Sequence, residues 1–185
     1  FSSKYGFPPI SRDNIRYDKS LGGGILNDAG CYPINASRML FESEPRGVFC
    51  NLTMDKETQV DTKATLLMDF EGNRQSQSSV GYDLEYESNY GLWGSDGSLS
   101  LTRAYNIPPD MQARLNIKNN SIEKEILIEP VNHFKLMIES FSDEIIKSNS
   151  CKYNFEKDLL NQAKVMEACR ISNNEKRYVE IKEIR

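Results

Sequence analysis

The chain of 185 residues has no long hydrophobic run, a single histidine, a single tryptophan and no excess of positive charge. Its longest apolar run, Ala64–Met68, is interrupted by Thr65 and falls far short of the roughly 20 residues that cross a bilayer. Lys and Arg number 23 against 27 Asp and Glu, whereas nucleic acids and anionic membranes bind clustered positive charge. We therefore expect neither a nucleic-acid partner nor a membrane partner.

Cysteine is also scarce, and the start of the chain lacks the features of a signal peptide. Cys31, Cys50, Cys151 and Cys169 are scattered without C-x-x-C spacing, which favours reduced thiols in a cytoplasmic protein and indicates no metal site. The first residue is Phe1, and neither a charged n-region nor an apolar h-region follows it. We expect the sequence to be part of a longer polypeptide.

The middle of the chain has the period-two pattern of β-strands. Short runs rich in β-branched and aromatic residues, separated by turn clusters, predict strands at Val48–Met54, Thr62–Phe70, Arg74–Gly81, Glu85–Trp93, Ser98–Thr102, Gln112–Ile117 and Ile122–Glu129. The tail Arg177–Lys182 alternates like an edge strand. In contrast, Phe1–Asp18 is aperiodic and rich in turn residues, which predicts an extended lead-in.

Three segments have a helical period. The first begins around Leu26, is disturbed at Pro33 and ends before Pro45. Two later apolar stripes comprise Phe134, Met137, Ile138, Phe141 and Ile145, behind Asn132 as N-cap, and Phe155, Leu159, Ala163, Met166 and Arg170. Both stripes predict faces that pack against the sheet. Residues 1–185 are thus expected to form one α+β domain with an open, mostly antiparallel sheet and helices packed on one face.

Three consecutive glycines, Gly22–Gly24, precede the first predicted helix. They permit positive φ angles and close approach of other atoms, but they match neither G-x-G-x-x-G nor a phosphate-binding loop. A tight turn and a ligand-facing loop remain equally good interpretations of the glycines alone.

Asp28 and Tyr32 follow four residues apart, so on a helix their side chains share one face. A phenol, with an ordinary pKa of about 10, exchanges protons near neutrality only when a nearby cation lowers that pKa. A purely structural interpretation also stays open, in which Asp28 favours the helix N-terminus and Tyr32 packs at the edge of the core. Arg38 is expected to pair with Asp28 or with a carboxylate of the sheet.

Several segments carry a resemblance to a known family. Residues 14–16 (NIR), residues 21–34 (LGGGILNDAGCYPI), Arg38 and Glu44-Pro45 resemble the entry into the C-terminal domain of the Gfo/Idh/MocA family of NAD(P)-dependent oxidoreductases, and residues 90–99 (YGLWGSDGSL) and 132–134 (NHF) resemble later segments of it. The resemblance implies an α+β substrate domain whose NAD or NADP is bound mainly by a separate N-terminal Rossmann domain. It also implies a sugar or nucleotide-sugar substrate and a homo-oligomer formed through the open sheet face.

The resemblance further implies roles for individual residues. Tyr32 would exchange a proton with the substrate, Asp28 would orient the substrate or Tyr32, and a Lys in an E-K-P motif of the other domain would supply the cation. Gly22–Gly24 and Arg16 would face the cofactor, although a surface ion pair is an equally good interpretation of Arg16.

Lys19 and His133 are the expected substrate-binding residues, although an exposed position at a helix start is also open for His133. The alternative for the whole chain is a non-catalytic ligand-binding or dimerisation module of the same fold.

Overall fold

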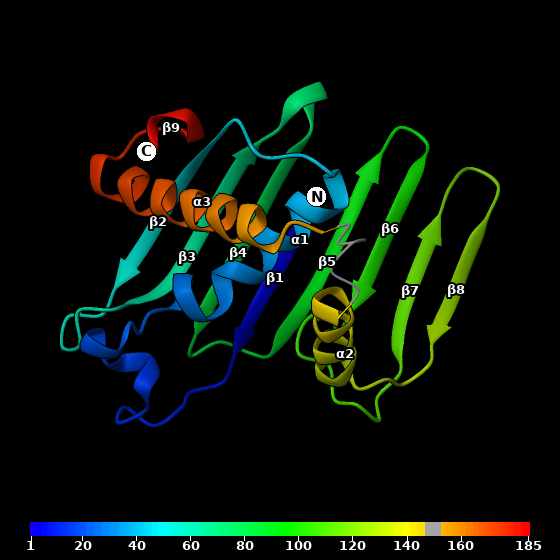
Figure 1. Cartoon of the computed structure of the whole chain (residues 1–185), viewed down its shortest axis with the longest axis horizontal. Coiled ribbons are helices and arrows are strands. Elements are labelled where there is room, and N and C mark those ends of the chain that lie inside the picture. Colours follow the sequence, from blue (N-terminus) through cyan, green and yellow to red (C-terminus); the bar gives the residue numbers. More distant parts are fainter. Residues whose placement is uncertain (147–152) are drawn as a thin grey trace.

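The computed structural model describes residues 1–146 and 153–185, which are organised around one open sheet. In these two ranges nine strands follow the order β8-β7-β6-β5-β1-β4-β3-β2-β9. Their bounds are Ser2–Phe7 (β1), Gly47–Met54 (β2), Asp61–Asp69 (β3), Gln75–Tyr82 (β4), Glu87–Gly94 (β5), Gly97–Thr102 (β6), Ala113–Lys118 (β7), Glu123–Ile128 (β8) and Val179–Glu180 (β9). The helices α1 (Cys31–Phe41), α2 (His133–Ile146) and α3 (Phe155–Glu175) lie on one face of the sheet (Figure 1). This arrangement confirms the predicted fold class.

The prediction of an extended lead-in is wrong for its first residues, because Ser2–Phe7 form the central strand β1. This strand pairs in parallel with β4 and antiparallel with β5, and it is the dark blue arrow in the middle of Figure 1. Ser3 and Tyr5 are buried on the helix side, whereas Lys4 is exposed on the far side. Serine, lysine and glycine are poor or neutral strand formers, so the two neighbouring strands determine this element more than its own sequence does.

All seven strands predicted in the middle of the chain are confirmed, with ends that differ by at most two residues. The predicted edge strand over Arg177–Lys182 is confirmed only as the two-residue strand β9, which pairs with Gly47 and Val48 of β2. Beyond β9 the edge of β2 is covered by α3. There the backbone N–H groups of Cys50 and Leu52 donate to the side chains of Ser172 and Asn173, each at 2.9 Å.

The main core lies between α1, α3 and strands β2 and β3. Its fully buried members include Ile34, Val48, Leu66, Met68, Phe70, Val165 and Cys169. The predicted stripe on α3 is wrong in its first half, because Phe155, Leu159 and Ala163 are exposed. The face that packs against β2 carries Met166 as predicted, together with Val165, Ala168, Cys169, Ser172 and Asn173. Two of these residues are polar edge partners of β2, which a search for apolar periodicity does not detect.

The prediction that α2 packs its apolar stripe against the sheet is wrong. Its N-cap is confirmed, since Asn132 Oδ1 accepts a hydrogen bond from the N–H of Lys135 at 3.0 Å. No residue of the helix is buried, however. The stripe residues are all exposed: Phe134, Met137, Ile138, Phe141 and Ile145. The helical period therefore predicted the helix correctly, but it did not predict whether the apolar face is buried against the sheet.

The predicted helix from Leu26 is confirmed, with its irregularity one turn before Pro33. Leu26–Gly30 form a π-helical segment that continues directly into α1. Proline lacks an N–H and its ring crowds the carbonyl four residues earlier, here that of Ala29, so a wider turn at this point accommodates Pro33. π-Helical segments of this kind are frequent at functional sites.

Three of the four cysteines fall in the described ranges, and all three are free thiols. Cys31 is half-buried, whereas Cys50 and Cys169 are buried. Cys151 lies outside the described residues. Among the helices in residues 1–146 and 153–185, none combines the length and apolar character needed to cross a membrane.

Candidate active site

Tyr32 lies in the first turn of α1 and lines a cavity of about 450 Å³ between α1, α3 and the sheet. The cavity lining consists of Cys31, Tyr32, Asn35, Ala36, Met39, Tyr90, Ala104, Tyr105 and Gln162. Tyr32 is 41% exposed, so part of the residue is open to a bound molecule. A concave surface with a few polar groups among apolar ones is the usual form of a small-molecule site.

Two further phenols hold the Tyr32 ring in place. Its centroid lies 5.4 Å from that of Tyr5, edge to face, and 5.6 Å from that of Tyr105. Tyr105 Oη is itself fixed by a 2.9 Å hydrogen bond with Ser3 Oγ. Burial raises the pKa of Tyr5 to about 12 and also raises that of Tyr105, so both remain protonated near neutrality. Of the three phenols, only Tyr32 is accessible enough to exchange a proton with a ligand.

Asp28 lies in the π-helical segment, one turn before Tyr32, and pairs with Arg16. The Nε of Arg16 donates to Asp28 Oδ2 at 2.7 Å, and both side chains are partly exposed. The structure therefore brings together Tyr32, Asp28 and Arg16, three of the residues selected from the sequence. Tyr82, whose hydroxyl is buried without a hydrogen-bond partner among the described residues, is subject to the charges of the same pair.

The charges around Tyr32 in the described chain disfavour its phenolate, which is the form that acts as a base. Partial burial raises the pKa of the Tyr32 phenol, the neighbouring Cys31 and Asp28 raise it further, and only Arg16 opposes them. Arg16 is already neutralised by Asp28, which explains why its effect is the weaker one. A cation from outside the described residues is needed for Tyr32 to lose its proton near neutral pH.

The three glycines differ in what they contact. A side chain on Gly23 would meet the carbonyl oxygens of Arg16 and Asp18 at 2.6 and 2.8 Å, and one on Gly24 would clash with the carboxylate of Asp61. That carboxylate accepts a 2.6 Å hydrogen bond from the N–H of Leu26 at the helix start.

Gly22 is different, because it has a φ of 77° and nothing within 4 Å of the position that a side chain would take. The close packing around Gly23 and Gly24 thus explains why these two positions carry no side chain. Only Gly22 presents open space to a ligand.

Lys19 and His133 do not line the Tyr32 cavity. Lys19 is exposed and lines a separate hollow together with Arg12, Tyr17 and Thr58. His133 is half-buried at the start of α2, where its ring lies 4.4 Å from that of Phe134. Substrate binding by either residue stays a prediction.

Sequence reasoning did not select Asn35 and Gln162, the two carboxamides of the cavity. Asn35 lies one turn after Tyr32 on α1, which a helical projection from Tyr32 could have found. Gln162 comes from α3, and its side chain donates to the carbonyl of Cys31 at 3.0 Å. No local signal in the sequence indicates that contact, because it joins residues far apart in the chain.

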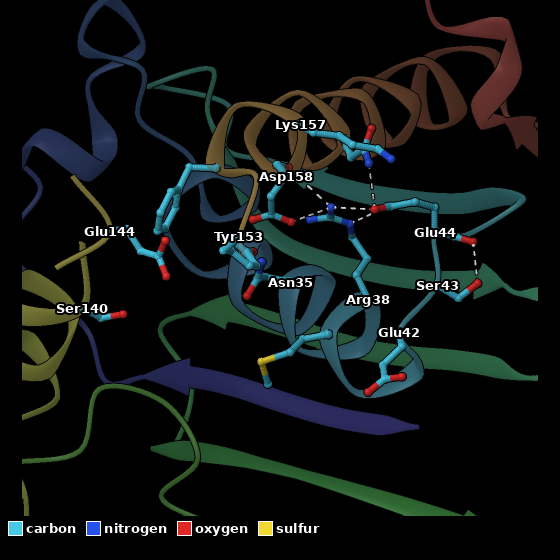
Figure 2. Close-up of a pocket in the computed structure, with 13 residues that line it drawn as sticks. Asn35, Arg38, Glu42, Ser43, Glu44, Ser140, Glu144, Tyr153, Lys157 and Asp158 are labelled. Carbon is cyan, nitrogen blue, oxygen red and sulfur yellow. Dashed lines mark hydrogen bonds and ion pairs between the residues drawn. The ribbon is translucent and has the colours of Figure 1, made fainter. Parts of the chain in front are cut away.

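Arg38 pairs with neither Asp28 nor a carboxylate of the sheet, contrary to the sequence-based expectation. Its buried guanidinium donates to Glu44 at 2.6 and 2.9 Å, to Asp158 at 2.8 Å and to Gln162 at 2.7 Å. Figure 2 shows Glu44 and Asp158 converging on Arg38 between α1 and α3. Arg38 therefore connects the two helices and, through Gln162, the wall of the Tyr32 cavity. No group of His, Cys, Asp and Glu in residues 1–146 and 153–185 is arranged to hold a metal ion.

The fold of the chain matches part of a solved reductase structure. The crystal structure of KijD10, a 3-ketoreductase from Actinomadura kijaniata in complex with NADP and TDP-benzene, matches it with a TM-score of 0.83 at 24% identity. The match covers 92% of this chain and 52% of that chain, and it shows the shared fold.

A family model described as the GFO/IDH/MocA C-terminal domain matches residues 1–100, more than half of the sequence. The chain belongs to this family, as its motifs predicted.

Two curated relatives indicate the chemistry found among its homologues. The chain is 29% identical over 145 residues to dTDP-3,4-didehydro-2,6-dideoxy-alpha-D-glucose 3-reductase of Saccharopolyspora spinosa, which covers 78% of this chain and 44% of the relative. It is 26% identical over 134 residues to D-xylose 1-dehydrogenase (NADP(+)) 2 of Haloferax volcanii, which covers 72% of this chain and 41% of the relative. These two relatives are oxidoreductases, one of a nucleotide sugar and one of a sugar. The chain spans less than half the length of either relative.

Proposed function

We propose that this chain is the substrate-binding and catalytic C-terminal domain of an NAD(P)-dependent oxidoreductase that acts on a sugar or sugar derivative. The observation that carries the proposal is the accessible phenol of Tyr32 at a cavity, next to the Asp28–Arg16 pair. Membership of the family and the sugar oxidoreductases among its relatives support the same reaction class.

Tyr32 is the proton-transfer residue in this proposal. A nicotinamide cofactor, when bound, supplies or accepts the hydride at the reacting carbon. In reduction, Tyr32 donates its phenolic proton to the carbonyl oxygen, which becomes a hydroxyl group. In oxidation, the Tyr32 phenolate removes the hydroxyl proton. Because the pKa of Tyr32 is raised in the described chain, the oxidative direction requires a cation from another domain.

Asp28 and Arg16 act as an orienting pair. With one carboxylate oxygen held by Arg16 at 2.7 Å, Asp28 has a fixed direction and can accept a hydrogen bond from a substrate hydroxyl through its other oxygen. A charge-assisted pair of this kind positions a ligand without taking part in the proton transfer.

The chain's own residues fit a cofactor only at one edge. Gly22 faces open space, and the neighbouring Gly23 packs against the backbone of Arg16, whereas Gly24 is occupied by its contact with Asp61. We therefore assign contact with the nicotinamide end to Gly22 and Arg16. The rest of the dinucleotide would be held by a separate Rossmann domain, because the chain has no glycine-rich dinucleotide motif.

The proposal is tested with the full-length polypeptide. Tyr32→Phe should lower kcat/KM for hydride transfer at least about 100-fold, in line with the loss of a general acid–base group. Tyr178→Phe is the matched control, because Tyr178 is equally exposed, at 41%, and does not line the Tyr32 cavity. Wild-type turnover by the Tyr32→Phe enzyme at every pH from about 5 to 10 would contradict the assigned role.

The full-length protein also separates catalysis from binding. A polypeptide that binds sugars but transfers no hydride would favour the alternative of a non-catalytic module. The open face of the sheet is, in addition, our proposed surface for homo-oligomerisation.

A further inference from the structure

The cavity beside Tyr32 offers neutral hydrogen-bonding groups and aromatic rings to a ligand. Asn35 and Gln162 contribute carboxamides, and Tyr90 and Tyr105 contribute rings whose centroids are 5.9 Å apart. No Lys or Arg lines this cavity in the described part of the chain. Carboxamides bind sugar hydroxyls as both donors and acceptors, and aromatic faces pack against the C–H faces of sugar rings.

A second, larger cavity of about 760 Å³ continues from the first, since Asn35 and Met39 line both. Its charged residues are the carboxylates Glu42, Glu44, Glu144 and Asp158 and the cations Arg38 and Lys157. Figure 2 shows Glu42 at one end of the cavity and Glu144 at the other, with Asn35 between them. Among the described lining residues, the carboxylates outnumber the cations two to one.

Arg38 is not available to a ligand in this second cavity. Its side chain is 4% exposed and its donors are directed at Glu44, Asp158 and Gln162. Lys157 is thus the one cation of the described lining that is not already paired with carboxylates. A phosphate group placed here would meet the carboxylates Glu42 and Glu144, which are unpaired in the described chain, and gain at most one ion pair, with Lys157.

We propose that the Tyr32 site accepts an uncharged sugar and that the carboxylates beyond Asn35 disfavour nucleotide-linked and phosphorylated sugars. The inference rests on the proposed function, which it narrows from sugars and nucleotide sugars to neutral ones. The reacting ring lies against Tyr90 and Tyr105, and Asn35 binds its hydroxyls. The carboxylates of the neighbouring cavity can accept hydrogen bonds from further hydroxyl groups, whereas they repel a diphosphate.

The first test compares matched substrates on the full-length polypeptide. Free aldoses and ketoses are assayed against the nucleoside-diphosphate derivatives of the same sugars, with NAD(H) and NADP(H). We expect kcat/KM for the free sugar to exceed that for its nucleotide-linked form at least tenfold. Raising the ionic strength from about 0.01 to 0.15 M should lower KM for the nucleotide-linked sugar and leave KM for the free sugar nearly constant, because only the former is repelled.

The second test reverses charge in the larger cavity. Glu42→Lys combined with Glu144→Lys should raise the ratio of kcat/KM for nucleotide-linked over free sugar about tenfold. Neither residue forms an ion pair within residues 1–146 and 153–185, in contrast to Glu44 and Asp158. Glu71→Lys with Glu129→Lys is the control, because it changes net charge equally at exposed positions outside both cavities.

The outcomes are distinguishable from failure of the proposed function. Preference for nucleotide-linked sugars, or an equal response of the two double variants, overturns the inference. In either case, observed hydride transfer still supports the proposed oxidoreductase function. Absence of turnover with every sugar of both classes overturns the inference together with the proposed function. A neutral-sugar preference that the Glu42→Lys, Glu144→Lys variant relaxes supports both.

Discussion

The two halves of the sheet differ in what covers them. Strands β2 and β3 lie beneath α1 and α3, and they bury Val48, Cys50, Leu66 and Met68 completely. Strands β6–β8 have only half-buried residues on that side, and α2 in front of them has no buried residue. Burial of apolar surface is the main source of folding free energy, so the covered half should dominate the stability of the described chain.

The largest expected contrast comes from one leucine in each half. Leu66 of β3 is fully buried, whereas Leu127 of β8 is 47% exposed. Leu66→Ala should lower the free energy of unfolding by about 3 kcal/mol, through lost burial and a cavity. Leu127→Ala should change it by less than about 0.5 kcal/mol. Urea unfolding followed by circular dichroism measures both, and a comparable loss in the two variants would show that the uncovered half is packed as tightly as the covered one.

A smaller contrast is expected from two arginine ion pairs. Arg38 is buried and serves two carboxylates, whereas the Arg114 side chain, paired with Glu125 across β7 and β8, is 63% exposed. Arg38→Met should cost about 2 kcal/mol, below the usual loss for a buried pair because Glu44 and Asp158 are partly exposed and regain water. Arg114→Met should cost no more than about 0.5 kcal/mol. Equal effects in thermal unfolding would contradict the assignment of Arg38 as the connection between α1 and α3.

The same ion pair should give the covered half an acid-sensitive contribution. Burial acts to raise the pKa of Glu44, but hydrogen bonding and ion pairing with Arg38 outweigh it and lower that pKa below its ordinary value. A carboxylate with a lowered folded-state pKa stabilises the fold above its unfolded-state pKa and loses this effect as pH falls through the folded-state value. Unfolding free energies measured from pH 6 down to about pH 3 should therefore fall less steeply in Arg38→Met than in wild type. Arg114→Met, as the control, should keep the wild-type slope.

The sequence predicted strands well wherever each strand has its own apolar alternation. Ala64, Leu66 and Met68 alternate along β3, Phe70 continues the pattern just after it, and all four are buried. The central strand β1 was not predictable in this way, because Ser3 and Lys4 have no strand preference and the pairing partners lie more than 70 residues away. Propensity reports local preference, whereas β1 is determined by long-range pairing.

The candidate site was predictable to the extent that it is local. Asp28 and Tyr32 come together because they are one helical turn apart, and the family resemblance gave them roles. Arg16, Tyr105 and Gln162 reach the same region from three other segments, and only the fold brings them there. The apolar stripe of α2 shows that a local pattern can also mislead. Its period predicts a buried face, but no residue of α2 is buried in the described chain.

The smallest effect on stability, and the sharpest test of the uncovered half, is expected at Trp93. This residue is the chain's single tryptophan, it is 91% exposed, and the register of β5 with β1 places it on the face opposite the helices, where Lys4 also lies. Trp93→Ala should therefore leave the unfolding free energy within about 0.5 kcal/mol of wild type.

If homo-oligomers form through that open face, Trp93 emission should shift to the blue and become less accessible to iodide as protein concentration rises. Light scattering on the same samples should show the mass increase, and Trp93→Ala should weaken it. Association without any change in Trp93 fluorescence would instead place the interface on the helix side, where α2 and β6–β8 leave apolar residues uncovered. Trp93 fluorescence thus distinguishes an interface on the open face of the sheet from one on the helix side.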